Sequence, residues 1–144
     1  MENFITHVFR VLVDETMTIE DAVKAGNFNR SNENITSERF PKPANGQKTE
    51  KEVVIFHFNK MMLSKAAIAK MDKAGSIWVL LGLAIKEPDL QREFPIVALG
   101  SVCELNGNRY VAYLHKNFVA PRLLYLSCFS DTWLAHCRFV GVRK

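Results

Sequence analysis

Residues 102–114 read VCELNGNRYVAYL and contain the clearest local structural signal in the chain. Two runs suited to β-strands flank Asn106-Gly107. Asn-Gly is a preferred sequence for a two-residue hairpin turn, because both central residues need positive φ. Side chains alternate along a strand, so the second strand has two faces. We place Tyr110, Ala112 and Leu114 on one face, and Val111 and Tyr113 on the other.

Further strands are predicted on both sides of this hairpin. Residues 52–58, EVVIFHF, combine β-branched and aromatic residues, and residues 94–101, FPIVALGS, form a second apolar run. The last strand is predicted at 138–143, RFVGVR, where Gly141 indicates a bulge or a close backbone approach. His57 lies between two phenylalanines, and we interpret it as a structural histidine rather than a metal ligand or catalytic group.

Two helices are predicted between the strands at 52–58 and 94–101. Ser64 is the expected N-cap of the first, which runs to Gly75. The second, at 77–85, is apolar nearly all round and should be buried. A short helical turn at 88–93 follows.

The N-terminal third is less regular. Residues 4–13 carry apolar side chains at helical spacing, but their valines also suit a strand, so both interpretations stay open. Thr18 is a good N-cap for a short helix that ends at Gly26. Residues 27–51 are polar and turn-rich, which predicts a connecting segment.

Composition excludes several classes of protein. With 144 residues, 48% apolar and 24% charged, the chain is most simply one soluble domain. No apolar run reaches membrane-spanning length. We recognise no secretion signal, so the cytoplasm is the default location, with display at a cell surface or virion left open. Three cysteines at unpatterned spacing predict neither disulfide dependence nor a metal site.

The formal net charge of +4 lies entirely in residues 101–144, which hold six Lys/Arg and two Asp/Glu. A basic region can attract nucleic acid. Here the basic residues are scattered, so we do not expect nucleic-acid binding. Residues 1–144 also contain no P-loop, dinucleotide-binding, HExxH or CxxC motif. We therefore predict no enzymatic activity and no cofactor.

Residues 117–132, NFVAPRLLYLSCFSDT, are unusual in what they lack. They contain no Lys, Glu, Gln, Met or Trp, whereas residues 1–116 contain 28 residues of these five types. A codon that ends in a pyrimidine cannot encode any of the five. The segment leads into a regular ending, CRFVGVRK, which suggests a displayed surface between fixed strands.

The order of these elements resembles the C-type lectin fold, with EVVIFHF and CRFVGVRK as terminal strands that could pair. In detail the chain resembles the ligand-binding variable proteins of diversity-generating retroelements, especially small versions from archaea and uncultivated bacteria. The similar stretches are KEVVIFHFNK, AIAKMDKAG, PDLQREFPIVALGSV, GNRYVAYL and Trp133 with CRFVGVRK, and MTIEDAVKAGNFN before them has the same look.

The resemblance implies an α+β fold with two helices, a small antiparallel sheet, paired terminal strands and an irregular C-terminal loop region. The lectin-like domain would span 51–144, after an N-terminal helical or extended segment and polar connection at 1–50. It also implies that an error-prone reverse transcriptase rewrites adenine-rich codons at the 3′ end of the gene. The ligand would be a protein or another surface ligand, and the apolar segment 4–13 is a candidate for pairing between copies.

The variable region implied by this resemblance is about 113–137. Alternation around Leu124 and Leu126, taken as core, leaves Tyr125 and Ser127 outward. The candidate variable, ligand-binding residues are His115, Asn117, Phe118, Tyr125, Ser127, Phe129, Ser130, Leu134, Ala135 and His136. The scaffold would include Trp133, Arg138 and Phe139, and Lys116 is expected to be fixed. For Tyr125, Phe129 and Leu134 an ordinary core position stays an open alternative.

Two other functions stay open at this point. One is an oxidase on the same fold, similar to the formylglycine-generating enzymes, for which Cys128 and Cys137 are the local candidates, with His136 adjacent. The other is a nucleic-acid-binding module that uses the basic C-terminal region with Tyr125, Phe129 and Trp133.

Overall fold

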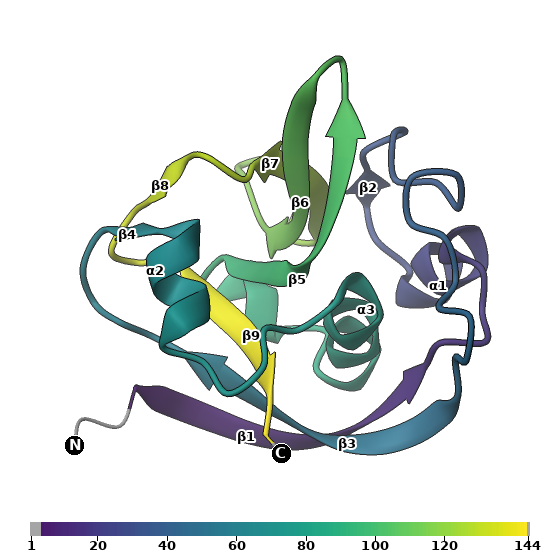
Figure 1. Cartoon of the computed structure of the whole chain (residues 1–144), viewed down its shortest axis with the longest axis horizontal. Helices are drawn as coiled ribbons and strands as arrows, with labels where there is room; N and C mark the ends of the chain where they lie inside the picture. Colours follow the sequence, from purple (N-terminus) through teal and green to yellow (C-terminus); the bar gives the residue numbers. More distant parts are fainter. Residues whose placement is uncertain (1–3, 144) are drawn as a thin grey trace.

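The computed structural model describes residues 4–143, which form an α+β protein built on a seven-stranded mixed sheet (Figure 1). The strand order is β1-β3-β9-β5-β6-β7-β2, and β4 pairs with β8 in a separate two-stranded sheet. The elements are β1 (Ile5–Asp14), α1 (Ile19–Gly26), β2 (Arg30–Ser31), β3 (Lys48–Phe56), β4 (Met62–Leu63), α2 (Ser64–Ala69), α3 (Ile77–Lys86), the 3-10 turn η1 (Leu90–Arg92), β5 (Ile96–Leu105), β6 (Asn108–His115), β7 (Leu123–Cys128), β8 (Thr132–Trp133) and β9 (Arg138–Val142).

The expected pairing of the two outer predicted strands is present. β3 and β9 are antiparallel, from Val53 opposite Val142 to Phe56 opposite Phe139. The expectation of a small antiparallel sheet is wrong, because β9 runs parallel to β5 and β2 runs parallel to β7. Gly141 makes the close approach that its position predicted, since a Cβ there would lie 2.7 Å from the Phe56 ring and 3.0 Å from the Lys73 carbonyl oxygen.

The N-terminal segment joins the same sheet. Residues 5–14 form strand β1 along β3, so the helical interpretation of 4–13 is wrong. Alternate side chains, Val11 and Val13, enter the core, as two-residue periodicity requires. Val8 and Leu12 lie on the exposed side of this edge strand, and pairing of copies through it stays a prediction.

Two hydrophobic cores form, one on each face of the sheet. Consecutive residues of β3 divide between them: Val53 and Ile55 join the core around α1 and α3, and Val54 and Phe56 join the core under α2. Strand β6 divides in the same way, so the two faces predicted from residues 110–114 are confirmed. Because both faces of the sheet are covered, the central strands read as nearly continuous apolar runs.

The hairpin turn and one of the two predicted helix caps are confirmed, and the other cap is wrong. Asn106 and Gly107 have φ of 53° and 82°, which confirms the two-residue hairpin turn. Thr18 caps α1 by accepting a hydrogen bond from the backbone N–H of Asp21 at 3.2 Å, as predicted. The predicted cap at Ser64 is wrong: the N-cap position is Leu63, and α2 ends at Ala69 rather than at residue 75.

The predicted irregular region is more ordered than expected. Residues 123–128 form β7, which pairs with β6 from Tyr110 opposite Cys128 to His115 opposite Leu123. β3 also begins at Lys48, inside the predicted connection. Residues 1–3 and Lys144 of the predicted segments lie outside the described residues. Within residues 4–143 no helix is long and apolar enough to cross a membrane.

The close packing at Gly141 yields a stability prediction. Gly141→Ala should lower the free energy of unfolding by about 1–3 kcal/mol, because its methyl group would overlap the Phe56 ring. Urea unfolding measures this. As a control, Lys65→Ala should change stability by less than about 0.5 kcal/mol, because Lys65 is exposed. Equal effects of the two changes would contradict the assigned packing.

Candidate functional site

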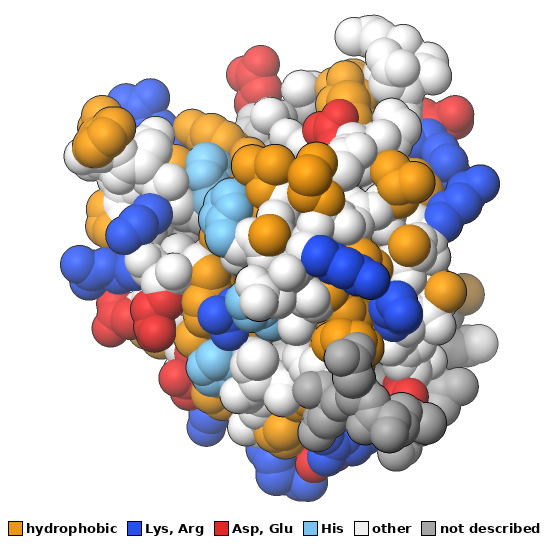
Figure 2. All heavy atoms as spheres, turned by 90° about the vertical axis from the view of Figure 1, so that its left-hand side faces the viewer, with side chains coloured by type: hydrophobic (Ala, Val, Ile, Leu, Met, Phe, Trp, Pro, Cys, Tyr) orange, Lys and Arg blue, Asp and Glu red, His pale blue; other side chains and the backbone are white. Residues whose placement is uncertain are grey.

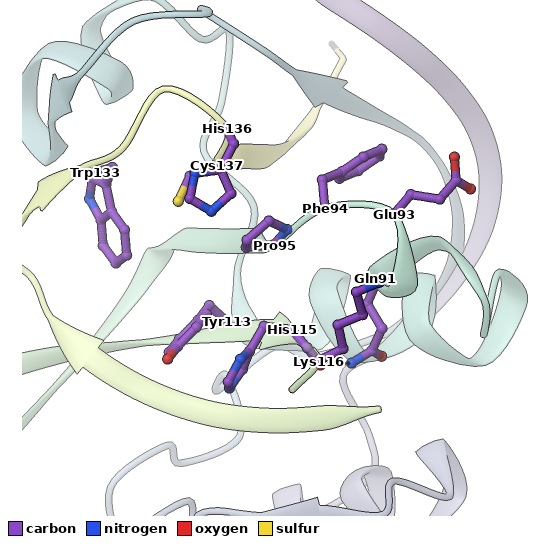
Figure 3. A pocket seen from close by; sticks show the side chains of 10 residues that line it. All are labelled: Gln91, Glu93, Phe94, Pro95, Tyr113, His115, Lys116, Trp133, His136 and Cys137. Carbon is purple, nitrogen blue, oxygen red and sulfur yellow. Dashed lines mark hydrogen bonds between the residues drawn. The ribbon is translucent and has the colours of Figure 1, made fainter. Parts of the chain in front are cut away.

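An aromatic-walled pocket of about 390 Å³ opens between the 3-10 turn η1, strand β6 and the loop that joins β8 to β9 (Figure 3). Gln91, Glu93, Phe94 and Pro95 line it from the η1–β5 segment. The other lining residues come from β6 and its end and from the β8–β9 region: Tyr113, His115, Lys116, Trp133, His136 and Cys137. The surface that includes β8 carries histidine side chains in a column among hydrophobic side chains (Figure 2).

Stacked rings connect this pocket with β7. Tyr113 and His115 lie two residues apart on one face of β6, and their ring centroids are 4.6 Å apart. The His115 and Tyr125 rings are tilted edge to face with centroids 5.0 Å apart, and the Tyr113 centroid lies 6.5 Å from that of Trp133. Tyr113 and Tyr125 are partners in the β6–β7 register. The sheet register therefore builds a continuous row of aromatic and imidazole rings.

Gln91 holds the end of the β6–β7 pair. Its Nε2 group donates to the carbonyl oxygens of His115 at 2.8 Å and Leu123 at 3.0 Å. Carbonyl oxygens only accept hydrogen bonds, so these contacts fix the orientation of the amide. The Gln91 side chain is buried, with 2% of the residue exposed, and its Oε1 has no hydrogen-bond partner within residues 4–143.

His115 adds a second such atom. Its Nε2 is buried and finds no partner in the described part of the chain. Burial lowers the pKa of His115, while a hydrogen bond with the Lys116 backbone opposes this. The ring is therefore neutral near pH 7, and in a neutral imidazole one nitrogen donates and the other accepts. Two of the residues that line the pocket thus carry a buried polar atom that has no partner within residues 4–143.

Side chains from outside residues 117–137 fix the backbone of the neighbouring loops. The Ser64 hydroxyl donates to the Phe129 carbonyl oxygen at 2.5 Å and accepts a hydrogen bond from Trp133 Nε1 at 2.9 Å. His57 Nε2 lies 3.0 Å from the Ala135 carbonyl oxygen, to which it must donate. His57 thus has the structural contact that its surroundings predicted.

Arg122 ties the same region to the helices. Its guanidinium donates to the carbonyl oxygens of Gly26 and Asn27 at the end of α1, Ala84 near the end of α3, and Pro88. A cation is favourable at these helix C-termini, where carbonyl groups lack helical partners. Burial lowers the pKa of Arg122, although an arginine keeps its charge.

The candidate variable residues divide by exposure. Asn117, Phe118, Ser130, Leu134 and His136 are exposed, and His115, Tyr125, Ser127 and Ala135 are half-buried. Phe129 is only 8% exposed and packs in the core under α2, so its expected outward position is wrong. It faces inward because its backbone is held by Ser64 and Arg109 stacks on its ring at 4.5 Å.

The structure brings only part of this set together. His115 and His136 line the main pocket, and Tyr125 contacts His115. Ser130 lies elsewhere, in a separate hollow of about 220 Å³ with Phe129, Arg109 and α2. Asn117 turns its side chain onto its own loop, where its Oδ1 accepts from the backbone N–H groups of Val119 and Ala120. Ser127 is hydrogen-bonded to Asp131 at 2.9 Å.

The scaffold residues are packed in different ways. Phe139 and Trp133 are buried, with 1% and 6% exposed. Arg138 lies over the Phe94 ring at 3.9 Å and donates to Thr6 Oγ1. Gln91 and Tyr113 were missed as site residues. Two-residue alternation from His115 could have identified Tyr113, but no local pattern signals a buried Gln91.

No group of three or more His, Cys, Asp or Glu side chains within residues 4–143 could hold a metal ion. Cys103, Cys128 and Cys137 are all unpaired. Burial raises the pKa of Cys137, which disfavours the reactive thiolate form.

The Ser64 contacts yield a second prediction. Ser64→Ala leaves the Phe129 carbonyl and Trp133 Nε1 buried without partners, so the free energy of unfolding should fall by about 2–3 kcal/mol. Hydrogen exchange in residues 129–137 should accelerate as well. Ser130→Ala is the matched control at an exposed site and should change stability by less than about 0.5 kcal/mol. Comparable losses in the two variants would refute the role of Ser64.

The lowered pKa of His115 predicts a pH dependence. Below about pH 6.5, the unfolded chain binds a proton at this residue that the native state resists, so stability falls as the pH falls. His115→Phe keeps the ring contacts but removes this contribution. Urea unfolding at about pH 7.5 and about pH 5.5 should therefore show a smaller loss on acidification in the variant. An unchanged loss would show that His115 titrates alike in both states.

Comparisons with known proteins supply no relative for this site. No protein-family model, no curated protein and no solved structure matches the chain. The function is accordingly inferred from the contacts described above.

Proposed function

We propose that this protein is a non-enzymatic binding protein with a diversified C-terminal surface, similar to the variable proteins of diversity-generating retroelements. Its ligand would be a protein or another surface ligand. One observation carries the proposal. The segment that lacks Lys, Glu, Gln, Met and Trp is held through its main chain by side chains that lie outside it.

The main-chain contacts explain how such a surface could vary. Gln91 and Ser64 donate to the carbonyl oxygens of Leu123 and Phe129, and His57 donates to that of Ala135. Every residue type has a backbone carbonyl, so these bonds are independent of the side chains at the accepting positions. Exposed neighbours such as Leu134 and His136 can then change with little cost in stability.

The topology supports the C-type lectin part of the proposal. The resemblance implies first and last strands that pair, with two helices between the first strand and the hairpin strands. β3 pairs with β9, and α2 and α3 lie between β3 and β5 in the chain. Strands β5, β6 and β7 then form consecutive antiparallel neighbours. β1 and α1 add to this arrangement from the N-terminal side.

Neither alternative function gains support from specific contacts. The oxidase alternative depends on Cys128 and Cys137, but the Cys137 thiol has a raised pKa. The nucleic-acid alternative depends on free basic side chains. Arg109 and Arg138 are stacked on phenylalanine rings, and Arg122 donates to backbone carbonyls. These three side chains therefore do not form an open phosphate-binding surface.

The genomic neighbourhood tests the proposal directly. Sequencing should find a reverse-transcriptase gene and a near-copy of the 3′ end of this gene that differs at adenines. The differences should fall in codons for exposed or half-buried residues such as Tyr125, Leu134 and His136, and spare Arg122 and Trp133. A neighbourhood with neither feature would sink the proposal.

Tolerance of substitution supplies a fourth biophysical prediction. The combined variant Ser130→Tyr, Leu134→Asn, His136→Tyr should keep the free energy of unfolding within about 1 kcal/mol of the parent, because all three sites are exposed. The single variant Arg122→Ala should lose about 2–4 kcal/mol, because it leaves carbonyl groups of both helices without partners. Urea unfolding of both measures the contrast. A triple variant less stable than Arg122→Ala would contradict the idea that exposed side chains can vary while Arg122 holds the fold.

A further inference from the structure

The loop that joins β6 to β7 projects a large apolar side chain into solvent. Phe118 is completely exposed, and the next residue, Val119, is 82% exposed. A single exposed apolar side chain is ordinary on a protein surface. A phenylalanine and a valine that follow one another at a loop tip form a small apolar surface, and contact with a partner would remove it from water.

Asn117 holds this loop in one shape. Its Oδ1 accepts hydrogen bonds from the backbone N–H groups of Val119 and Ala120, both at 2.8 Å. The backbone N–H of Asn117 donates to the carbonyl oxygen of Ala120 at 3.0 Å, and Ala120 is buried. The backbone at Phe118 is therefore fixed before any partner arrives, which lowers the entropy that binding would cost.

The main pocket is a matching recess close to this loop. Lys116, which lines the pocket, lies two residues before Phe118 in the chain. The pocket walls include the rings of Phe94, Tyr113 and Trp133, on which another ring can stack (Figure 3). Its volume of about 390 Å³ exceeds the roughly 150 Å³ of an apolar cavity that binds benzene. Phe118 of the same chain does not fill it, because that ring is completely exposed.

The charges at the pocket suit a second copy of the chain. Glu93 and Lys116 are exposed lining residues of opposite charge, and within residues 4–143 neither forms an ion pair. If Phe118 of one copy enters the pocket of another, Lys116 of the entering loop approaches Glu93 of the receiving pocket. Opposite charges that meet across an interface favour that pairing over others.

We propose that a second copy of this chain occupies the main pocket, and that two copies exchange their Phe118 rings about a two-fold axis. Each copy carries one ring and one pocket, so a symmetric pair uses both and then stops growing. The contact is small, and the dimer is therefore a weak species whose population depends on concentration. This inference goes beyond the proposed function and does not rest on it.

Sedimentation equilibrium over about 10 µM to 1 mM protein tests the association. The wild type should move from monomer toward dimer. Phe118→Ser removes two rings from each dimer and should weaken association at least about 100-fold, about tenfold for each ring. Val8→Ser is the matched control, because it replaces an exposed apolar side chain on the edge strand β1. It should leave the association unchanged.

Three outcomes of this measurement would overturn the proposal. The wild type could remain a monomer throughout, or its mass could grow beyond that of a dimer, which would exclude the two-fold exchange. The dimer could also persist in Phe118→Ser and be lost in Val8→Ser, which would place the contact on β1. Phe118 is completely exposed in the monomer, so its replacement should not affect folding.

NMR can place the ring in the pocket. Isotope-labelled Phe118→Ser has an intact pocket and no ring to exchange. Excess unlabelled wild type should shift its Trp133 indole resonance, whereas excess unlabelled Phe118→Ser should not. Trp78 is the internal reference, because it lies in the core on the other face of the sheet, and its indole should not shift. Equal shifts with the two partners, or no shift at Trp133, would show that the ring does not enter the pocket.

A competitor and a charge exchange complete the test. Toluene has the shape of the phenylalanine side chain, so it should compete for the pocket and dissociate the dimer. Lys116→Glu and Glu93→Lys should each weaken association, and the double variant, which exchanges the two charges, should recover it. A dimer that resists toluene, or a double variant no better than the single variants, would contradict the assigned contact.

Failure of this inference and failure of the proposed function are distinguishable. A chain beside a reverse transcriptase and an adenine-variant repeat would remain a diversified binding protein even if it were monomeric. A chain without that neighbourhood could still exchange Phe118 rings. Phe118 is also a candidate variable position, so variants produced by diversification would pair in this way only where a ring is kept there.

Discussion

The arrangement of the C-terminal region depends on hydrogen bonds from fixed side chains to main-chain carbonyl groups. Gln91, Ser64 and His57 come from three separate parts of the chain, and each holds a carbonyl of residues 123–135. Ser64 and Gln91 are almost completely buried, so the bonds form away from water, where an unmade bond is costly. The two-residue pairing of β4 with β8 also holds the backbone of the loop around Trp133, as does the hydrogen bond from the Phe129 N–H to the Arg109 carbonyl oxygen.

Four arginines in residues 101–144 make contacts within the fold. Arg122 joins the C-terminal ends of α1 and α3 to the start of β7, where its own backbone N–H donates to Asn29. Arg138 and Arg109 each cover a phenylalanine ring. Arg143 makes a 3.4 Å ion pair with Glu52. The basic excess of the C-terminal third is therefore divided among separate contacts, which explains why a charge count alone is a poor guide to function.

Local sequence predicted the parts of the fold that local chemistry determines. The Asn106-Gly107 turn follows from its backbone dihedrals, and the cap at Thr18 follows from a hydroxyl beside free N–H groups. Residues 4–13 were ambiguous because their spacing fits both periods, and only pairing with β3 selects the strand. Ser64, like Thr18, is a hydroxyl residue just before a predicted helix. Its hydroxyl group instead contacts Phe129 and Trp133, which lie far along the chain. Long-range partners of this kind are absent from any sequence window.

The same distinction governs the candidate site. Exposed positions such as Leu134 and His136 could be anticipated from their place beside Trp133, whereas the inward turn of Phe129 depends on Ser64 and Arg109. The pocket joins both kinds of residue. Some lining residues, including Gln91 and Tyr113, are not candidate variable positions. Others, His115 and His136, are.

A binding surface with constant pocket walls and a variable rim would separate affinity from specificity. Constant aromatic walls would supply the same anchoring contact to every ligand, and buried contacts of this type commonly dominate binding energy. The exposed rim would then select among ligands that share the anchor, through contacts that can also be repulsive. Diversification in such a protein need not create a new site each time, because Tyr113 and Trp133 would already provide aromatic walls.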